Sequence, residues 1–594
     1  MKKLKNTRIS HVETKDYLPL LFLIGILPII TIAHTCANSY GDYPWSISGD
    51  ILDFFLWGKS IVLYCITLLM VGIFIYNVKK KKWFPSMNNQ LYWIITYAGL
   101  ALLSALFSNY KQVSFTGATE QFESVFVLIS YVVICIFSYY LIDASSQTAV
   151  IVERWWKNFF LICLMPTLFL CTSQFFHMDL FQFLLANTSV NFNFTAGTVY
   201  GSFYNPNFVG SYVVLLFPVV LLLLLGMKSI TTRILCVLSL IMLTFALLGS
   251  RSASGFLILG IVCLIFLITQ IHNWKTAGIA GIVIVVGIIG FYLANATHDH
   301  YYTQKISLSM HPEANEPAIQ SIETNDEDLQ IIYKGNLLKI RFQYDDTVAD
   351  PYIFTILDQK DQMVSEETDS SDGSIHLTDE RFQAIQICPV SISDMNNLLA
   401  FYVTIDNKNW LFTNQTDGTY YYINPFGNLD KIDNAPMALF TKNSGFASGR
   451  GFLWGKTIPL LKKYILLGSG PDTYAYVYPQ SDYVGKYNNG YEGTYVTRPH
   501  NMYLQIWTQT GLLSLICFLV FYGIYMIQSF HIYRPKQKAT YEWYVGYGIF
   551  LGTLGYMLIG FFNDSTITVA PVFWCLLGIG IAINCKIKPT NKTV

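Results

Sequence analysis

The stretch RPHNMYLQIWTQTG, residues 498–511, combines a histidine with an arginine and an asparagine where a polar loop meets an apolar run. Imidazole takes up a proton near neutral pH, so His500 could act as a general base toward a hydroxyl nucleophile. The neighbouring Arg498 would favour the neutral, base-competent form of the ring. A lone loop histidine is more often an ordinary surface residue, and spacing alone leaves that alternative open.

Two arginines in other segments could bind an anion. Arg251 lies in LLGSRSASG, a very short turn between two apolar runs, and Arg450 lies in SGRGFLW. A guanidinium can grip a phosphate with two parallel hydrogen bonds. An arginine at the depth of a helix costs roughly 2.5–3.5 kcal/mol, so it usually has an anionic partner. The alternatives are that Arg251 reaches a lipid phosphate and that Arg450 is an ordinary solvated charge.

Two further loops carry polar side chains beside apolar runs. In YGSFYNPNFVGSY, the carboxamides of Asn205 and Asn207 could bind sugar hydroxyls, although Asn207 could equally cap the following helix. In NYKQVSFTGATEQFES, Lys111, Glu120 and Glu123 could pair with the arginines or simply be solvated. Asn205, Asn207, Lys111 and Glu120 are therefore candidate substrate-binding residues.

The elements that must position these residues are membrane spans. Of 594 residues, 53% are hydrophobic and only 13% are charged, whereas a soluble protein carries about a quarter charged residues. Recurring apolar runs of roughly 18–25 residues predict a polytopic α-helical membrane protein with about 12 transmembrane helices. The predicted spans are 17–35, 54–77, 90–108, 123–143, 155–176, 206–226, 231–249, 253–271, 277–295, 504–528, 541–562 and 566–585.

The distribution of charge between loops predicts the orientation. Most lysines and arginines of short loops gather on the side of the N-terminus, as in residues 79–82 and 534–538. Positively charged loops stay on the cytoplasmic side, so we expect both termini in the cytoplasm. The first span lacks a small-residue cleavage site and is expected to be retained. The long segment between the ninth and tenth spans is then extracytoplasmic.

This long segment divides in two. Residues 300–440 contain short β-branched and aromatic runs separated by turn residues, which predicts a β-rich module. Residues 441–503 include GRGFLWGKTIPLLKKYILLGSG, whose apolar spacing and lysines predict an amphipathic helix on the outer surface, beside the candidate active site. The flanking ranges 1–299 and 504–594 form an N-terminal and a C-terminal membrane domain.

Several kinds of site have no signature in the chain. No Cys/His spacing resembles a zinc site, and neither a Walker A motif nor a G-x-S-x-G nucleophile elbow occurs. The acidic run NDEDL lies among turn residues, which favours a solvated loop over a metal site. We therefore expect no metal, no cofactor and no nucleic-acid partner, and a substrate that arrives already activated.

These motifs resemble those of the O-antigen ligase and O-antigen polymerase superfamily. The family's His-Asn pair and following Gly are matched by His500, Asn501 and Gly511, although Ser514 replaces the second Gly of the usual Gly-x-x-Gly. GSFYNPNFVGSY, GSRSASG, and SGRGFLW followed by LLGSGPDTY are similar to its other motifs. The long outer segment after the ninth span is also typical of the family, whereas residues 300–440 match nothing in the common pattern and look like an insertion.

The resemblance implies a glycosyltransferase of the bacterial cytoplasmic membrane. It would transfer or polymerise glycan from an undecaprenyl-diphosphate carrier onto a hydroxyl of a glycan, cell-wall or protein acceptor, without a metal. Arg251 and Arg450 would hold the diphosphate, and His500 would deprotonate or orient the acceptor hydroxyl. Arg498, Asn501 and Asn205 are secondary candidates.

Transport is the competing class. A transporter or a flippase of lipid-linked glycan would also have many spans, but transporters often carry repeated halves and charges near the membrane midplane. In this chain the polar clusters lie at the predicted outer edge of the membrane, and the last three predicted spans do not resemble earlier ones in sequence. Both features favour the enzyme.

Overall fold

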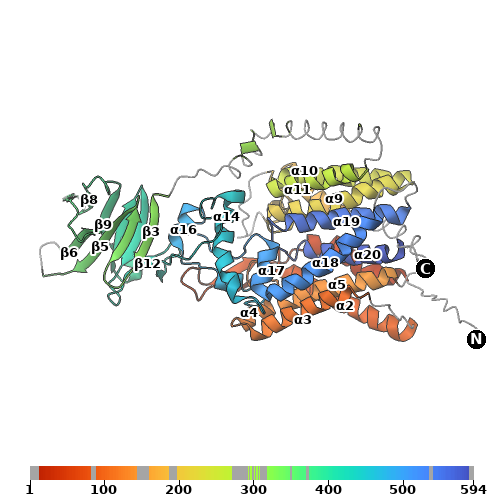
Figure 1. The fold of residues 1–594 in the computed structure, drawn as a ribbon, viewed down its shortest axis with the longest axis horizontal. Helices are drawn as coiled ribbons and strands as arrows, with labels where there is room; N and C mark the ends of the chain where they lie inside the picture. Colours follow the sequence, from red (N-terminus) through yellow and green to blue (C-terminus); the bar gives the residue numbers. More distant parts are fainter. Residues whose placement is uncertain are drawn as a thin grey trace, which may run out of the picture.

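The computed structural model describes residues 13–81, 88–143, 160–185, 197–270, 317–347, 351–369, 373–533 and 540–587, together with isolated residues between 271 and 316. Within these ranges the chain forms a helical bundle and a β module. A connecting segment of short helices lies between them (Figure 1).

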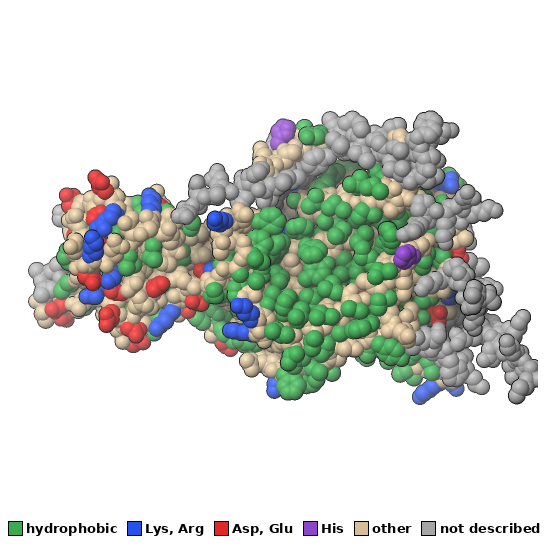
Figure 2. Space-filling view, in the orientation of Figure 1, with side chains coloured by type: hydrophobic (Ala, Val, Ile, Leu, Met, Phe, Trp, Pro, Cys, Tyr) green, Lys and Arg blue, Asp and Glu red, His purple; other side chains and the backbone are tan. Residues whose placement is uncertain are grey.

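Long apolar helices make up most of the bundle. Those long and apolar enough to cross a membrane are α2 (Trp57–Lys81), α5 (Val125–Asp143), α9 (Pro206–Gly226), α10 (Ile230–Ser250), α11 (Ala253–Gln270), α18 (Leu512–Ile532) and α20 (Ala570–Ile587). The other bundle helices are α1 (Leu18–Leu21), α3 (Leu91–Phe107), α4 (Lys111–Thr116), α7 (Leu161–Phe175), α8 (Leu180–Leu185), α17 (Met502–Thr510) and α19 (Tyr541–Ile559). The visible face of the bundle is apolar, as expected of a multi-pass membrane protein (Figure 2).

Two predicted spans have other boundaries in the structure. The first, 17–35, is a series of short helical turns from Thr14 to Ile29, after which β1 (His34–Ala37) pairs with β2 (Asp50–Asp53). The tenth, 504–528, is two helices, because Gly511 at φ +98° separates α17 from α18. Only glycine adopts such a conformation readily. The ninth, 277–295, lies almost entirely outside the described residues, so the count of about twelve spans stays a prediction.

Glycines let the central helices approach closely. A Cβ at Gly552 of α19 would lie 2.1 Å from the carbonyl oxygen of Leu215 in α9. A Cβ at Gly578 of α20 would lie 2.2 Å from the carbonyl oxygen of Cys135 in α5. In lipid, such close backbone packing drives helix association, because burying apolar side chains gains little there. The tight contacts bring the turn between α19 and α20 against the start of α9.

The predicted β-rich module is present, with strands between Ile319 and Asp430. One antiparallel sheet has the order β3 (Ile319–Thr324), β4 (Leu329–Tyr333), β5 (Asn336–Tyr344), β6 (Tyr352–Asp358). The other runs in sequence order through β7 (Glu366–Thr368), β8 (Ile375–Leu377), β9 (Ile385–Ile392), β10 (Leu398–Ile405), β11 (Lys408–Thr413), β12 (Tyr421–Ile423) and β13 (Leu429–Asp430). The sheets share one core, in which the rings of Phe342 and Phe401 lie 5.2 Å apart.

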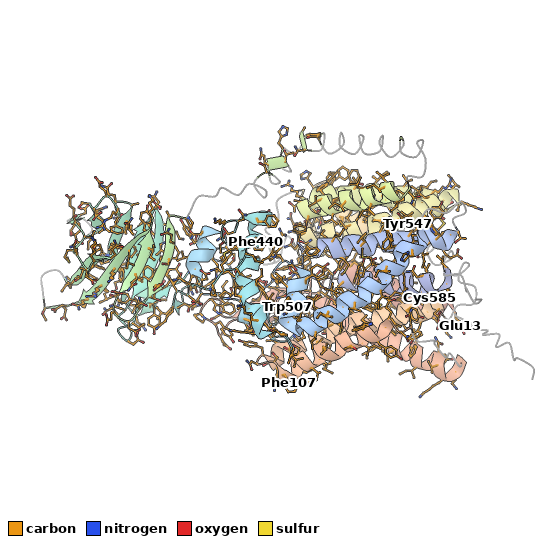
Figure 3. The ribbon with its side chains drawn as sticks, in the orientation of Figure 1. Glu13, Phe107, Phe440, Trp507, Tyr547 and Cys585 are labelled. Carbon is orange, nitrogen blue, oxygen red and sulfur yellow. The ribbon has the colours of Figure 1, made fainter. Side chains whose placement is uncertain are left out.

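The connecting segment, residues 431–501, contains α14 (Phe446–Thr457), α15 (Tyr474–Val477) and α16 (Tyr483–Asn488). The helix predicted here is present as α14 and a 3-10 turn, Ile458–Lys463, but α14 is not an amphipathic surface helix, because residues 451–457 are all buried. Lys462 and Lys463 are exposed, whereas Lys456 is buried and pairs with Asp482. Figure 3 places Phe440 between the β module and the bundle, and Cys585 toward the opposite end of the bundle.

Candidate functional site

His500 and Asp564 form a hydrogen-bonded pair in which Nδ1 of the imidazole lies 3.0 Å from Oδ2 of the carboxylate. The imidazole is 34% exposed, and the carboxylate is fully buried. Burial alone would raise the pKa of Asp564, but His500, Arg498 and the backbone N–H of Asn501 together hold this pKa below its usual value. An ionised carboxylate at this distance accepts a hydrogen bond from Nδ1–H and so favours the tautomer in which Nε2 is the basic nitrogen.

The backbone around His500 fixes the position of the ring. His500 has a left-handed conformation, φ +51°, which costs roughly 1–3 kcal/mol and occurs mostly where surrounding contacts enforce it. On one side, the carbonyl oxygen of Pro499 accepts a hydrogen bond of 3.0 Å from Nε1 of Trp454. On the other side, the Asn501 side chain caps α17, and its backbone N–H donates to Oδ1 of Asp564 at 3.1 Å.

A polar cavity of about 220 Å³ opens beside the imidazole. It is smaller than the roughly 300–1,000 Å³ pockets that enclose drug-sized ligands, so it suits one end of a larger substrate. Hydroxyls, a carboxamide, an imidazole and a guanidinium can bind sugar hydroxyls and phosphate oxygens. The described ranges hold no group of three His, Cys, Asp or Glu side chains arranged for a metal ion. The cavity is lined by Asn207, Ala253, Ser254, Ser448, Arg450, Tyr491 and His500.

A left-handed stretch of backbone directs Arg450 to this cavity. Ala447, Ser448 and Gly449 have φ values of +52°, +61° and +86°. A Cβ at Gly449 would lie 3.0 Å from the Tyr491 hydroxyl, so this ring packs directly against the turn. The guanidinium donates to the carbonyl oxygen of Ala447 at 3.0 Å, while its buried Nε has no hydrogen-bond partner among the described residues. Burial lowers the pKa of Arg450, which destabilises the cation and favours an anionic ligand.

Arg498 has a different environment and does not line the cavity. Its guanidinium donates to the carbonyl oxygen of Glu120 and lies over two rings, 5.6 Å from that of Tyr204 and 5.4 Å from that of Phe208. Burial raises the pKa of Glu120, against the opposing effect of Arg498. Arg498 thus joins the loop before α5 to the start of α9, as a structural contact beside the site.

The remaining predicted residues divide between the cavity wall and its surroundings. Asn207 lines the cavity, whereas Asn205 caps α9 by accepting a 2.9 Å hydrogen bond from the backbone N–H of Asn207. The alternative that Asn207 is the cap is therefore wrong. Arg251 ends α10 in a left-handed conformation, φ +51°, two residues before the cavity-lining Ala253. Lys111 begins α4, is exposed and lies outside the cavity lining.

Asp564 is the main candidate that the sequence analysis missed. It lies in FFNDSTITV, a polar interruption between α19 and α20, and an acid beside an apolar helix end was the available signal. Its neighbour Asn563 donates to the carbonyl oxygen of Asn207 at 3.2 Å and to the Ser211 hydroxyl at 2.9 Å. The turn between α19 and α20 therefore contacts the cavity wall as well as His500. Of the other cavity residues that were not singled out, Ser254 and Ser448 lie within the motifs GSRSASG and SGRGFLW, and Tyr491 lies in none of the quoted motifs.

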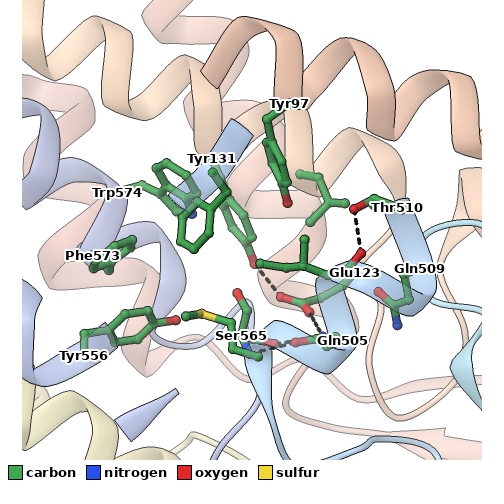
Figure 4. A pocket seen from close by; sticks show the side chains of 14 residues that line it. Tyr97, Glu123, Tyr131, Gln505, Gln509, Thr510, Tyr556, Ser565, Phe573 and Trp574 are labelled. Carbon is green, nitrogen blue, oxygen red and sulfur yellow. Dashed lines mark hydrogen bonds between the residues drawn. The ribbon is translucent and has the colours of Figure 1, made fainter. Parts of the chain in front are cut away.

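A second, smaller cavity lies inside the bundle against α17 (Figure 4). Its volume of about 20 Å³ is near that of one water-sized probe, so no sugar fits. Glu123 lines it and accepts hydrogen bonds from the Tyr131 hydroxyl at 2.6 Å and from Nε2 of Gln505 at 3.2 Å. Burial raises the pKa of Glu123 to about 8, so this carboxyl is largely protonated at neutral pH.

A family model described as O-antigen ligase matches residues 399–519. The matched region runs from β10 to α18 and contains Arg450, Arg498 and His500, but not Arg251 or Asp564. No curated protein matches the chain.

The match also includes residues 399–440, which form the last strands of the β module. The expectation that nothing in 300–440 follows the family pattern is therefore wrong for this part. The resemblance based on the motif around His500 is confirmed.

Proposed function

We propose, from the match of residues 399–519 to the O-antigen ligase family model, that this protein transfers glycan from an undecaprenyl-diphosphate carrier to an acceptor hydroxyl. The observation that carries this proposal is the cavity wall shared by the His500 imidazole and the Arg450 guanidinium. Glycosyl transfer from a diphosphate needs a group that takes the acceptor proton and a cation that receives the charge of the leaving group. One cavity supplies both.

In the proposed reaction, the acceptor oxygen attacks the anomeric carbon of the donor sugar while its O–H proton passes to Nε2 of His500. The bond between the anomeric carbon and the diphosphate oxygen breaks, and the diphosphate leaves with the electron pair. Attack opposite the leaving group inverts the anomeric configuration. The buried, ionised Asp564 stabilises the imidazolium that forms.

The cationic side chains have the complementary role. Arg450 stabilises the charge that grows on the leaving diphosphate, since its Nε and remaining N–H groups can donate to phosphate oxygens. Arg251, at the turn leading into the cavity-lining Ala253, is the proposed second cation. Asn207 would orient hydroxyls of the donor sugar.

The proposed setting is the outer face of the bacterial cytoplasmic membrane, with about twelve spans and both termini in the cytoplasm. Basic residues support this orientation, since Lys586 follows Cys585 at the end of the bundle opposite the β module (Figure 3). The acceptor would be a hydroxyl of a glycan, a cell-wall polymer or a protein that reaches the cavity from the side of the β module.

Proteoliposomes supplied with the native lipid-linked oligosaccharide test this function. His500→Ala and Arg450→Ala should each lower the transfer rate by about 10²–10⁴-fold, with carrier-linked donor remaining on the outer leaflet. His376→Ala removes an exposed histidine of the β module and is the matched control, with the wild-type rate expected. Wild-type transfer by His500→Ala would refute the site. Movement of donor across the bilayer without transfer would identify a flippase instead.

A further inference from the structure

The turn that carries Asp564 is held by α17 at two points. The Asp564 carboxylate accepts from His500 and from the backbone N–H of Asn501. The next residue, Ser565, pairs with the side chain of Gln505: its backbone N–H donates to Oε1 at 2.8 Å, and its carbonyl oxygen lies 3.3 Å from Nε2. Gln505 follows Asn501 by about one helical turn, so both contacts come from the start of one helix.

Glu123 and the Ser565 backbone together determine which way the Gln505 carboxamide points. A carboxamide has one donating end and one accepting end. Oε2 of Glu123 accepts from Nε2 of Gln505 at 3.2 Å, so Oε1 of Gln505 faces the backbone N–H of Ser565 (Figure 4). In the reversed orientation, two N–H groups would face each other at Ser565.

Glu123 itself has fixed partners. The Tyr131 hydroxyl donates to its Oε1 at 2.6 Å, and its backbone N–H donates to Oδ2 of Asp472 at 3.0 Å. Glu123 and Gln505 are each 4% exposed. Both line the cavity of about 20 Å³ and neither lines the cavity of about 220 Å³, so neither touches a substrate bound beside His500.

We propose that Gln505 and Glu123 are positioning residues that hold the 563–565 turn, so that Asp564 keeps the His500 imidazole aimed into the polar cavity. The proposal rests on the proposed function, because it concerns the same general base. It assigns a role in the transfer step to a buried hydrogen-bond chain that runs from Tyr131 through Glu123 and Gln505 to the turn.

Gln505→Met removes both ends of the carboxamide at nearly constant volume. Loss of orientation should lower kcat about 10- to 100-fold, while KM for the lipid-linked donor changes less than about twofold because Gln505 does not line the substrate cavity. Gln90→Met is the matched control. Gln90 is also buried, and it donates to the carbonyl oxygen of Phe521 at 2.8 Å, away from the turn. Its loss should lower the melting temperature and leave kcat unchanged.

A pH profile separates positioning from a merely structural role. In Gln505→Glu two carboxyls face each other, share one proton at low pH and repel when both ionise. Its kcat relative to wild type should therefore fall as pH rises from about 6 to about 9, whereas the deficit of Gln505→Met should not depend on pH. The other ionisable groups near Glu123 include Tyr97, Tyr131, Asp472, Arg498, Tyr556 and Asp564, and they are the same in both variants.

The exchanged pair Glu123→Gln with Gln505→Glu tests the direction of the carboxamide. A carboxamide at 123 then donates to a carboxylate at 505, whose other oxygen accepts from the Ser565 N–H. The exchange should recover at least about tenfold of the kcat lost by Gln505→Glu at high pH. Failure to recover any of it would overturn the assigned direction.

The variants also distinguish the inference from the function on which it rests. If Gln505→Met has wild-type kcat while His500→Ala is inactive, the positioning role is wrong and the proposed function stands. If His500→Ala transfers normally, the proposed function is wrong, and the positioning role that rests on it is wrong as well. A reduced kcat in Gln505→Met with inactive His500→Ala supports both.

Discussion

Two buried carboxyls lie on either side of the start of α17, and their pKa values shift in opposite directions. Burial raises the pKa of Glu123 to about 8. Burial also acts on Asp564, but His500, Arg498 and a backbone N–H hold its pKa below the usual value. Arg498 lowers the pKa of both carboxyls. Among the described residues, however, Glu123 accepts only from a hydroxyl and a carboxamide, whereas Asp564 accepts from the His500 imidazole and a backbone N–H.

Because the two pKa values shift in opposite directions, burial alone does not decide how a carboxyl acts at this site. Asp564 is a fixed negative charge, suited to stabilising an imidazolium, and its partner His500 lines a cavity large enough for part of a substrate. Glu123 is largely protonated at neutral pH and adjoins a cavity of about 20 Å³. One carboxyl therefore takes part in the charge changes of the proposed reaction, and the other holds its surroundings in place.

The largest expected effect on kcat comes from neutralising Asp564, the ionised carboxyl. Asp564→Asn should lower kcat by about 10³-fold, because the carboxamide can no longer hold the Nδ1–H tautomer or stabilise the imidazolium. Glu123→Gln replaces a carboxyl that is already largely protonated at neutral pH, so it should cost only about tenfold. Transfer rates in proteoliposomes at matched protein amounts compare the two. Equal losses of kcat in both variants would contradict the distinction between a charged and a positioning carboxyl.

The dependence of stability on pH should show the opposite signs of the two shifts. The pKa of Glu123 rises on folding from 4.5 to about 8, so stability falls as pH rises through this interval. The pKa of Asp564 falls on folding from 3.8, so its contribution is present above about pH 4 and is lost in more acidic solution.

Melting temperatures in detergent test this difference. Glu123→Gln should lose less stability than wild type between about pH 5 and pH 8, and Asp564→Asn should be least stable relative to wild type near neutral pH. Asp472, whose pKa burial raises to about 7, contributes equally to wild type and both variants. Parallel curves for Glu123→Gln and wild type would contradict the raised pKa.

The smallest expected effects come from the two asparagines at the start of α9. Asn205→Ala removes the helix cap and should cost about 1 kcal/mol of stability, with little change in KM for the donor. Asn207→Ala removes a cavity side chain and should raise that KM several-fold, about 1 kcal/mol of binding energy, with little change in stability. Thermal melts and donor titrations separate the two, and exchanged phenotypes would show that the residues have been assigned the wrong roles.

Sequence patterns predicted continuous helices better than their interruptions. The predicted span 206–226 coincides with α9, because Asn205 and Pro206 mark its start and the apolar run is unbroken. The prediction of one continuous tenth span missed the break at Gly511, since the residues on both sides are apolar enough to continue a helix. The reason for the break appears only in the packing. A Cβ at Gly511 would lie 2.7 Å from the carbonyl oxygen of Leu466, so only glycine fits where the chain turns.

The candidate site was predicted in part for a similar reason. His500 and Arg450 could be identified because an imidazole or a guanidinium beside an apolar run is conspicuous in sequence. Asp564 could not be paired with His500, because it follows His500 by 64 positions in the sequence and three complete helices, α17, α18 and α19, lie between them. Nor could sequence distinguish Arg498, which contacts a carbonyl oxygen and two rings, from Arg450, which lines the cavity.

The amino-acid sequence by itself determined the apolar helices, the β-rich module and the polar residues at the helix ends, because these depend on neighbouring residues along the chain. Only the tertiary structure decided which polar ends meet. The contacts of Gly552 and Gly578 bring α9, α19, α20 and α5 close together, and α17 packs against the turn that carries Asp564. The charge of a buried carboxyl depends on groups that packing places around it, so it could be assigned only after those neighbours were known.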